Sequence, residues 1–460
     1  MQKVAFHNLG CKVNAYEMEL MQQNFADSGY EIVPFSEKAD IYIVNTCTVT
    51  NIADRKSRQM LHRAKTLSPE AVVVAAGCYV ETDMEGALKD KSIDLIVGNK
   101  DKKDIVRLVE EYMSESKGSA EPEEVSDVPP KDQAAYRSTV CRPLTHLTDH
   151  TRAYIKIQDG CDQYCSYCII PYSRGHVVSR DEDETVSEIR GLVEEGCREF
   201  VITGINLSSY GLDRPYNMAA KDGKYNNEAL IDVIRKSAAI EGVQRIRLGS
   251  LEPRIITHDF LSAMSETEAF CPHFHLSLQS GSNEVLKRMN RRYDVDEYYE
   301  KVQLIRKYFE HPAITTDVIV GFPGETEEEF DETRSFLDKV NFYETHVFAY
   351  SRRRGTVADR MPGQLTQKQK SVRSAILMED SSRRAKSFRE YYKDSPAEVL
   401  IEEEAVVEGT PYLVGYNKEY VRFAVDKGDD DAKDMTGKII SCRALDFIGD
   451  ELLHAVSEGS

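Results

Sequence analysis

Three cysteines lie within eight residues in the segment GCDQYCSYCIIPYSRG, and we name Cys161, Cys165 and Cys168 the loop thiols. Cysteines at such spacing bind metal ions or iron–sulfur clusters, and a zinc ion or a cubane cluster usually takes four outer ligands. The nearest other cysteines, Cys141 and Cys197, fall outside any compact spacing. The segment therefore predicts a metal centre with one open position, and our hypothesis is that a small molecule binds there.

Zinc is the alternative metal for the loop thiols. Structural zinc sites usually join two pairs of cysteines, or a cysteine pair with a histidine pair. The sequence has no second pair nearby, although His176 follows eight residues after the last of these cysteines. A disulfide is a poorer explanation, because a reducing compartment keeps thiols free. The spacing favours a cluster and leaves zinc as the rival.

A second group of cysteines is dispersed along the first part of the chain. Cys11, Cys47 and Cys78, which we name the N-terminal thiols, each follow an apolar run that predicts a strand. Loops after parallel strands gather at one edge of a sheet, so thiols 36 and 31 residues apart can converge there. One such cysteine is typical of an ordinary buried residue. Three at matching places favour a shared cluster.

The elements that must position these thiols divide the chain into three parts. Residues 1–115 alternate Val/Ile-rich runs with helical patterns, which predicts an open parallel α/β sheet. Residues 116–145 are acidic, contain Pro, Ser and Gly, and read as a linker. Residues 146–380 resume the alternation with six strand–helix units and predict a partial (β/α)6 barrel. Residues 381–460 predict a helix that leads into a small antiparallel β-barrel.

Composition limits the class of protein. The chain has 460 residues, of which 41% are hydrophobic, and its net charge of −19 argues against a nucleic-acid binder that relies on bulk charge. No apolar run reaches the length of a membrane helix, and the N-terminus lacks the layout of a signal peptide. Ten cysteines in such a chain favour metal binding or catalysis over disulfides. We therefore expect a cytoplasmic protein with no membrane partner.

Several motifs together resemble one enzyme family. CDQYCSYC, with Tyr167 before the last cysteine, resembles the signature of radical S-adenosylmethionine (SAM) enzymes. LGCKVNAYE, NTCTVTNIADRKSRQ, AGCY, TGINLSSYG, LQSGSNEVLKRMNRRY and DVIVGFPGET extend the resemblance over nearly the whole chain to the methylthiotransferases, whose C-terminal barrel is of the TRAM type. The first two of these motifs are most similar to the branch that acts on N6-threonylcarbamoyladenosine at position 37 of tRNA.

The resemblance implies a radical SAM transferase with two [4Fe–4S] clusters. The loop thiols would hold three irons of one cluster, whose fourth iron binds SAM and cleaves it to a 5′-deoxyadenosyl radical. The N-terminal thiols would hold a second cluster, at which a sulfur is carried, methylated by another SAM and delivered to C2 of the adenine. All six cysteines are thus implied as metal ligands and catalytic residues. An electron donor such as a flavodoxin or ferredoxin is also implied.

The resemblance also implies contacts between this chain and SAM. The residues carried over for cofactor binding are Tyr167, Gly204, Asn206, Glu252, Gln279 and Gly321. For Gly204 and Asn206, the alternative is an ordinary Gly-rich turn after a strand. Arg174 and Arg180 could meet a carboxylate, although arginines are more often solvated surface groups.

Basic residues close to the predicted clusters and strand ends are the expected tRNA contacts. They are Arg55, Arg58, Arg352, Arg353 and Arg354. The run RMNRRY is also basic, and for each run the alternative is a solvated face. An adenosine in the anticodon loop is already unpaired, so its base can turn inward at low cost.

Three other functions stay open on the sequence. Two are methylthiolation of isopentenyladenosine in tRNA and methylthiolation of a ribosomal-protein side chain; the acidic C-terminal part is compatible with the latter. The third is a zinc-stabilised RNA-binding protein without catalysis.

Anaerobic treatment of the protein with iron and sulfide separates the cluster from zinc. We expect a brown protein that absorbs near ~400 nm, because thiolate-bound iron–sulfur clusters absorb there. A colourless protein that retains stoichiometric zinc would support the zinc-binding alternative instead.

Overall fold

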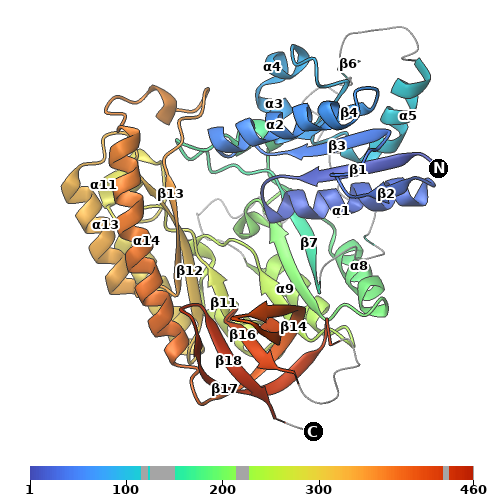
Figure 1. Ribbon diagram of the computed structural model, residues 1–460. Coiled ribbons are helices and arrows are strands. Elements are labelled where there is room, and N and C mark those ends of the chain that lie inside the picture. Colours follow the sequence, from blue (N-terminus) through green and yellow to red (C-terminus); the bar gives the residue numbers. More distant parts are fainter. Residues whose placement is uncertain (116–122, 125–143, 145–150, 214–226, 428–434, 459–460) are drawn as a thin grey trace.

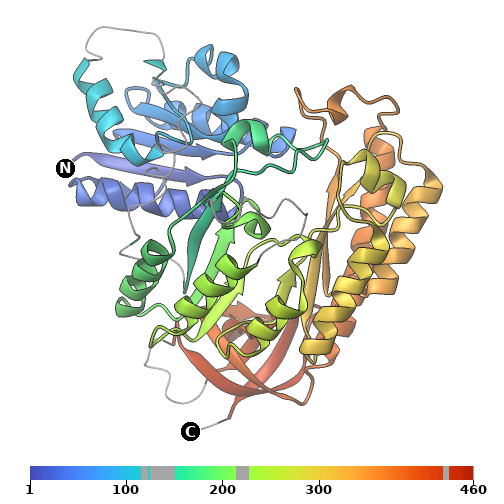
Figure 2. The same cartoon turned by 180° about the vertical axis from the view of Figure 1, so that it is seen from behind.

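The computed structural model describes residues 1–115, 123–124, 144, 151–213, 227–427 and 435–458. The N-terminal unit and the C-terminal barrel lie at opposite ends of a central unit (Figures 1 and 2). Most of the predicted linker 116–145 falls outside the described residues. In the part of the chain that is described, no helix combines the length and the apolar character needed to cross a membrane.

The N-terminal unit is a parallel sheet with helices on both faces. Its elements are β1 (Lys3–Asn8), α1 (Lys12–Asp27), β2 (Glu31–Val33), β3 (Ile41–Thr46), α2 (Asn51–Leu67), β4 (Val72–Gly77), α3 (Cys78–Thr82), α4 (Met84–Leu88), β5 (Leu95–Val97), η1 (Lys102–Asp104), α5 (Ile105–Glu115) and β6 (Glu123–Glu124). The strand order is β2–β1–β3–β4–β5–β6, and every neighbouring pair is parallel. One apolar core lies under α1 and α5, and another lies under α2, α3 and α4. The predicted open parallel sheet is confirmed.

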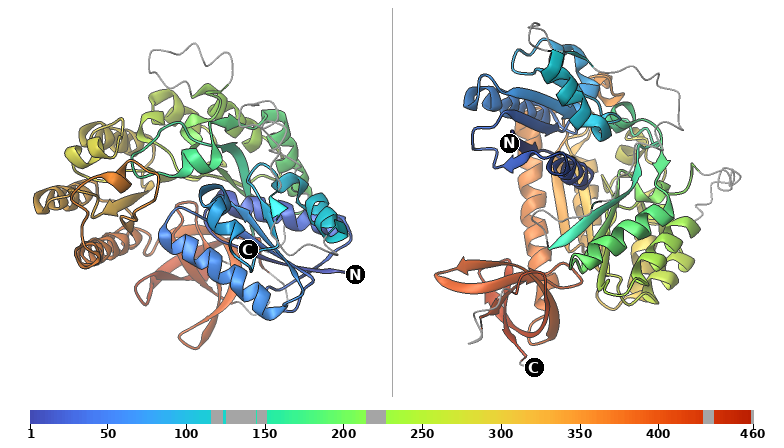
Figure 3. Two further views of the ribbon diagram at one scale, coloured as in Figure 1. Left: turned by 90° about the horizontal axis from the view of Figure 1, so that it is seen from above. Right: turned by 90° about the vertical axis from the view of Figure 1, so that its right-hand side faces the viewer.

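The central unit contains the six predicted barrel strands, with their helices outside (Figure 3). Its elements are β7 (Arg152–Asp159), α7 (Ile170–Arg174), β8 (Val178–Ser179), α8 (Glu182–Glu194), β9 (Glu199–Gly204), η2 (Leu207–Ser209), α9 (Glu228–Ala238), β10 (Arg245–Leu248), η3 (Pro253–Ile255), α10 (His258–Ser265), β11 (His273–His275), α11 (Asn283–Arg288), α12 (Val295–Tyr308), β12 (Ala313–Val320), α13 (Glu327–Val340), β13 (Glu344–Ala349), η4 (Ala358–Arg360) and α14 (Gln367–Glu390).

The strands of the central unit form two curved halves. One sheet has the order β10–β9–β7–β8 and the other has the order β11–β12–β13. Isolated bridges between Ile246 and Phe270 and between Leu251 and Leu276 join the two sheets. One large apolar core runs through both halves and beneath their helices. The predicted partial barrel is confirmed, and β8 adds a short antiparallel strand beside β7.

The C-terminal unit is a closed five-stranded barrel. Its strands are β14 (Pro396–Val407), β15 (Thr410–Tyr416), β16 (Arg422–Asp426), β17 (Ile439–Ile448) and β18 (Leu452–Ser457). Their order around the barrel is β14–β15–β16–β18–β17, and all pairs are antiparallel except β16–β18. The long helix α14 leads into it along β13, as the sequence predicts for the segment before this barrel.

A buried carboxylate and three arginines fasten the C-terminal barrel to the central unit. Glu199 receives the Nε of Arg247 at 2.7 Å, and Arg152 and Arg245 lie within 3.5 Å of the same carboxylate. The guanidinium groups also donate to carbonyl oxygens of the C-terminal barrel, namely those of Glu398, Tyr416, Asn417 and Lys418. Removing one of these four side chains leaves buried polar groups without partners, which lowers the stability of the folded protein.

Substituting Arg247 by Met tests this junction. Because Arg247 is buried and satisfies Glu199 and two carbonyls, we expect Arg247→Met to lower the free energy of unfolding by about 3 kcal/mol in urea titrations. The matched control is Arg422→Met, whose ion pair with Glu403 is exposed, and there we expect a loss below about 1 kcal/mol. Equal effects in the two variants would contradict this role for the junction.

Candidate active site: two groups of thiols

The loop thiols lie directly after β7, at the carboxyl end of a parallel strand. The turn into this loop requires Gly160, because its φ is +68° and a Cβ there would lie 1.9 Å from the carbonyl oxygen of His176. Cys161 then donates its backbone N–H to the carbonyl oxygen of Gly175 at 3.1 Å. This hydrogen bond closes the segment from Cys161 to Gly175 into one loop, which contains all three thiols.

Charged and polar side chains surround the loop thiols. Arg291 donates from Nη1 to Sγ of Cys165 at 3.2 Å, and its Nη2 lies 3.3 Å from Oε1 of Glu252. Burial, together with the nearby Cys165 and Glu252, raises the pKa of Cys161 to about 11, against the lowering effect of a hydrogen bond from Asn206. Burial and Cys165 likewise raise the pKa of Cys168 to about 12. Without a metal, Cys161 and Cys168 are therefore neutral thiols near pH 7.

The N-terminal thiols converge although they are far apart in sequence. Cys11 precedes α1, Cys47 follows β3, and Cys78 begins α3 after β4. These strands are neighbours in the sheet, so their carboxyl ends share one edge. Burial raises the pKa of Cys47 to about 11, and Cys78 and Cys11 lie close enough to contribute to this increase. The predicted convergence of the three cysteines is confirmed, and their role as metal ligands stays a prediction.

Both donor sets fit an iron–sulfur cluster. None of the nine cysteines that the structure describes forms a disulfide, so all six thiols are available as thiolates. Thiolates are the usual ligands of iron–sulfur clusters, and metal binding displaces protons from thiols whose pKa is high. Each group offers three sulfurs, which leaves one iron of a cubane without a cysteine ligand.

Two residues predicted to bind SAM lie beside the loop thiols. Asn206 hydrogen-bonds the Cys161 thiol through its side chain, and its own N–H donates to Oε1 of Gln158 at 2.8 Å. Glu252 is buried, and its charge acts on the same thiol. The structure thus places Asn206 and Glu252 beside Cys161, and their contact with SAM stays a prediction.

The other predicted SAM residues occupy strand ends or the core. Tyr167 packs against the apolar group formed by Phe322 and Tyr350. Gly204 ends β9 so close to Gln158 that a Cβ would lie 2.9 Å from that side chain. The last two, which lie at carboxyl strand ends and have positive φ, are Gln279 (φ 73°) and Gly321 (φ 70°).

The predicted tRNA arginines differ in accessibility. Arg55, Arg352 and Arg354 are exposed, whereas Arg58 is half-buried with its guanidinium 5.6 Å from the ring centroid of Tyr79. Arg353 is buried. Its guanidinium donates to side chains of the segment after Cys47, namely Thr48, Asn51 and Asp54. Arg353 therefore joins the two units, and the accessible basic groups are the other four.

Two residues contact cysteine sulfurs in a way that the sequence did not indicate. Arg291 belongs to the basic run RMNRRY, for which RNA contact or a solvated face was expected, yet it binds Cys165 and Glu252. Asn99 donates from Nδ2 to Sγ of Cys78 at 3.6 Å and to the carbonyl oxygen of Ser173 at 3.0 Å. Nothing in their local sequence distinguishes them, because both contacts cross between distant segments.

Arg174 and Arg180 are not surface groups, contrary to the more common state of arginine. Both are 2% exposed. Arg174 pairs with Glu17 and Asp159, and Arg180 pairs with Glu188. Arg180 also donates to the hydroxyl of Tyr16, so both arginines belong to buried contacts between the N-terminal and central units.

Two protein-family models match the chain, one for each group of thiols. The model of the radical SAM superfamily matches residues 155–337, which include the loop thiols. The model of the uncharacterized protein family UPF0004 matches residues 3–98, which include the N-terminal thiols.

Curated relatives match over most of the chain. The threonylcarbamoyladenosine tRNA methylthiotransferase MtaB of Bacillus subtilis (strain 168) is 38% identical over 446 residues, which cover 97% of this chain and 94% of that protein. The tRNA-2-methylthio-N(6)-dimethylallyladenosine synthase of Desulfotalea psychrophila is 32% identical over 401 residues, which cover 86% of this chain and 87% of that protein.

A solved structure has the same fold. The radical SAM methyltransferase TsrM from Kitasatospora setae, with tryptophan substrate and a SAM analog bound, aligns with a TM-score of 0.54. The alignment covers 75% of this chain and 73% of that chain at 17% sequence identity. This likeness concerns the fold alone.

Alkylation of the metal-free protein tests the environment of the loop thiols. Because the pKa of Cys161 is raised to about 11, we expect its alkylation rate to increase about tenfold per pH unit beyond pH 9. An ordinary thiol levels off near its pKa of about 8.5. Peptide mass spectrometry after timed alkylation measures the profile, and urea-unfolded protein is the control. A native profile that levels off near pH 9 would contradict the assigned environment.

Proposed function

The chain belongs to the radical SAM methylthiotransferase family, and we propose that it inserts a methylthio group at C2 of N6-threonylcarbamoyladenosine at position 37 of tRNA. The observation that carries the substrate assignment is the 38% identity over 97% of the chain to a threonylcarbamoyladenosine enzyme. The dimethylallyladenosine enzyme is less similar, at 32% over 86% of the chain. The ribosomal-protein and zinc-binding alternatives are not favoured.

SAM and [4Fe–4S] clusters are the cofactors of the enzyme. We propose that the loop thiols hold the cluster that binds SAM and that the N-terminal thiols hold the second cluster. When bound, the first cluster would supply the electron that cleaves the sulfonium of SAM, and the second cluster would carry the sulfur that is inserted. A radical route is needed because no general base removes the hydrogen on an adenine C2 at neutral pH.

The residues of the chain bind and orient the reactants. Arg291 holds Cys165 and Glu252 together, so the loop keeps one arrangement as SAM enters. The proposed contacts to SAM are Tyr167, Gly204, Asn206, Glu252, Gln279 and Gly321. Cys47 and Cys78 are buried against the apolar strands behind them, whereas Cys11 is exposed, so the N-terminal site is accessible from the side of Cys11.

The substrate is tRNA, and we propose that the anticodon loop binds between the N-terminal and central units. Supporting this, Arg55 lies on the helix after Cys47, and Arg352 and Arg354 follow β13, so exposed cations flank the proposed site from two sides. An electron donor such as a flavodoxin or ferredoxin and action in the cytoplasm are part of the same proposal. The proposed domains are 1–115, 146–380 and 381–460, with the linker 116–145 between the first two.

A matched pair of cysteine variants tests the division of work between the two sites. Cys165→Ala is expected to lose both SAM cleavage and RNA modification, because the first cluster loses a ligand. Cys47→Ala is expected to keep SAM cleavage within about threefold and to lose methylthio insertion at least about 10²-fold. Mass spectrometry of nucleosides from an anticodon stem-loop RNA that carries threonylcarbamoyladenosine measures the product, and 5′-deoxyadenosine measures SAM cleavage.

Cys197→Ala is the control, because Cys197 is buried away from both sites and its sulfur donates to the carbonyl oxygen of Glu199. A Cys47→Ala protein that still inserts methylthio groups would refute the role of the N-terminal thiols. A wild-type protein that modifies dimethylallyladenosine RNA and not threonylcarbamoyladenosine RNA would refute the substrate.

A further inference from the structure

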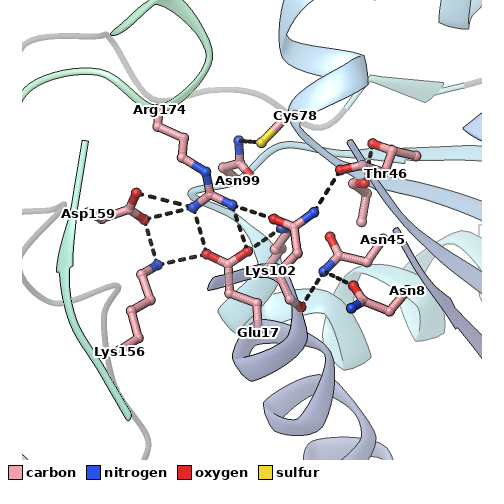
Figure 4. Close-up of polar contacts among 12 residues, drawn as sticks. Asn8, Glu17, Asn45, Thr46, Cys78, Asn99, Lys102, Lys156, Asp159 and Arg174 are labelled. Atoms are coloured by element: carbon pink, nitrogen blue, oxygen red, sulfur yellow. Dashed lines mark hydrogen bonds and ion pairs between the residues drawn. The ribbon is translucent and has the colours of Figure 1, made fainter. Parts of the chain in front are cut away.

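Five charged side chains are buried together where the N-terminal unit meets β7 and α7 of the central unit (Figure 4). We name them the interface ion cluster: Glu17 on α1, Lys102 on η1, Lys156 and Asp159 on β7, and Arg174 at the end of α7. Each is at most 7% exposed. Two come from the N-terminal unit and three from the central unit, so the ion cluster lies across the boundary that the reaction must cross.

Arg174 is the central member of the ion cluster. Its Nη1 lies 2.8 Å from Oε1 of Glu17 and 3.1 Å from the carboxylate of Asp159. Lys156 bridges the same two carboxylates at 2.7 and 2.5 Å, and Lys102 binds Glu17 at 2.6 Å. The second nitrogen of the fork, Nη2, lies 3.2 Å from Oε2 of Glu17 and also donates to Asn14, a set of directed contacts that a single ammonium group cannot reproduce.

Hydrogen bonds connect Arg174 to the chain segments that carry Cys11 and Cys47. Its Nη2 donates to Oδ1 of Asn14 at 2.7 Å. Nδ2 of Asn14 donates to the carbonyl oxygens of Leu9 at 2.7 Å and Thr46 at 3.0 Å, close before Cys11 and directly before Cys47. The side chain of Asn14 thus connects Arg174 to the two segments that carry these cysteines.

The remaining thiols are reached from the same place. Asp159 accepts the N–H of Gly160 at 2.7 Å, directly before Cys161. Helix α7, which starts just after Cys168, packs against α3, which starts at Cys78. Asn99 joins these two helices by donating to Sγ of Cys78 and to the carbonyl oxygen of Ser173. All of these connections meet within the few residues around Arg174.

The members of the ion cluster stay charged despite their burial. Burial alone would raise the pKa of Glu17, but Arg174, Lys102 and Lys156 hold it well below its usual value. The carboxylate of Asp159 lies within 3.1 Å of both Arg174 and Lys156, so it is paired with two cations. Three cations therefore face two carboxylates, which leaves one net positive charge beside the thiols.

Burying five charges is expensive, and apolar residues of similar volume often stabilise an interface better. An arrangement that is costly for stability and connected to both reaction sites indicates a role in the reaction. We propose that Arg174 is a positioning residue for methylthio transfer: it holds the loop thiols and the N-terminal thiols at one separation, so that the sulfur carried at one site meets the adenine activated at the other.

The proposal rests on the proposed function and adds two consequences to it. A shift of about 1 Å between reacting groups can cost on the order of 10²-fold in rate. If this separation between the two groups of thiols changes, SAM cleavage should therefore continue while methylthio transfer fails. SAM would then be consumed without formation of methylthiolated RNA. The net positive charge should also favour the reduced form of the nearby N-terminal cluster, because cluster potentials follow local charge and hydrogen bonds to sulfur.

Two substitutions at Arg174 separate geometry from charge. Arg174→Lys keeps the charge and loses the fork, so we expect the ratio of 5′-deoxyadenosine to methylthiolated RNA to rise at least about tenfold. Arg174→Met loses both, so we expect the same rise and also a lower midpoint potential. The potential is read by EPR titration in a background with Cys161→Ala, Cys165→Ala and Cys168→Ala, which leaves the N-terminal cluster alone.

Arg180→Lys is the matched control. Arg180 is equally buried, pairs with Glu188 and donates to the hydroxyl of Tyr16 on α1, so it joins the same two units without contacting a thiol segment. We expect its ratio of products to stay at the wild-type value. A wild-type ratio in Arg174→Lys and Arg174→Met, or an equal rise in Arg180→Lys, would overturn the proposal.

Iron content is measured first, so that all variants are compared with both clusters in place. If the Arg174 variants lose iron, Glu17→Gln carries the test with the same expected rise in the ratio. Loss of iron from all of these variants, with Arg180→Lys fully loaded, would overturn positioning in favour of a role in cluster assembly. A wild-type protein that cleaves SAM and never modifies the RNA would instead contradict the proposed function.

Discussion

The structure depends on the way parallel strands bring distant residues to one edge. Every one of the six thiols lies in a segment that follows the carboxyl end of a parallel strand or begins the helix after it. The loop thiols need only the single turn after β7, whereas the N-terminal thiols need the adjacency of β1, β3 and β4. Because the strand is buried and the loop after it is free to vary, each site combines a rigid base with reactive side chains.

Methylthio transfer between the two groups of thiols requires that the sheet edges carrying them face each other. Buried charges provide this alignment here, because an ion pair between two units has one favourable geometry, while apolar surfaces can slide. Arg174, Glu17 and Asp159 lie at that boundary, and Arg353 ties the segment after Cys47 to the segment after β13. At the other end of the central unit, Glu199 and its arginines fix the C-terminal barrel in the same manner. Charged junctions on both sides of the central unit thus set the arrangement of the three units.

Local patterns predicted the parts of the molecule that local forces determine. Apolar runs such as IYIVNT and VVVAAG indicated buried strands, and their order indicated the parallel sheet, the six barrel strands and the final barrel. The position of each N-terminal thiol after a predicted parallel strand also correctly predicted that these three cysteines lie close together. The burial of Arg174 and Arg291 could not be predicted in this way, because their carboxylate partners lie 157 residues away for Glu17 and on another strand end for Glu252. An arginine in a polar stretch looks solvated until the fold supplies its counter-ion.

The central claim is that each group of thiols leaves one iron of its cluster open, and that SAM binds to the open iron held by Cys161, Cys165 and Cys168. Mössbauer spectroscopy of the protein loaded with ⁵⁷Fe, recorded with and without SAM, tests this most directly. The account predicts one distinct iron in the cluster of the loop thiols whose signal changes when SAM is added. Irons that are all alike and indifferent to SAM would contradict it.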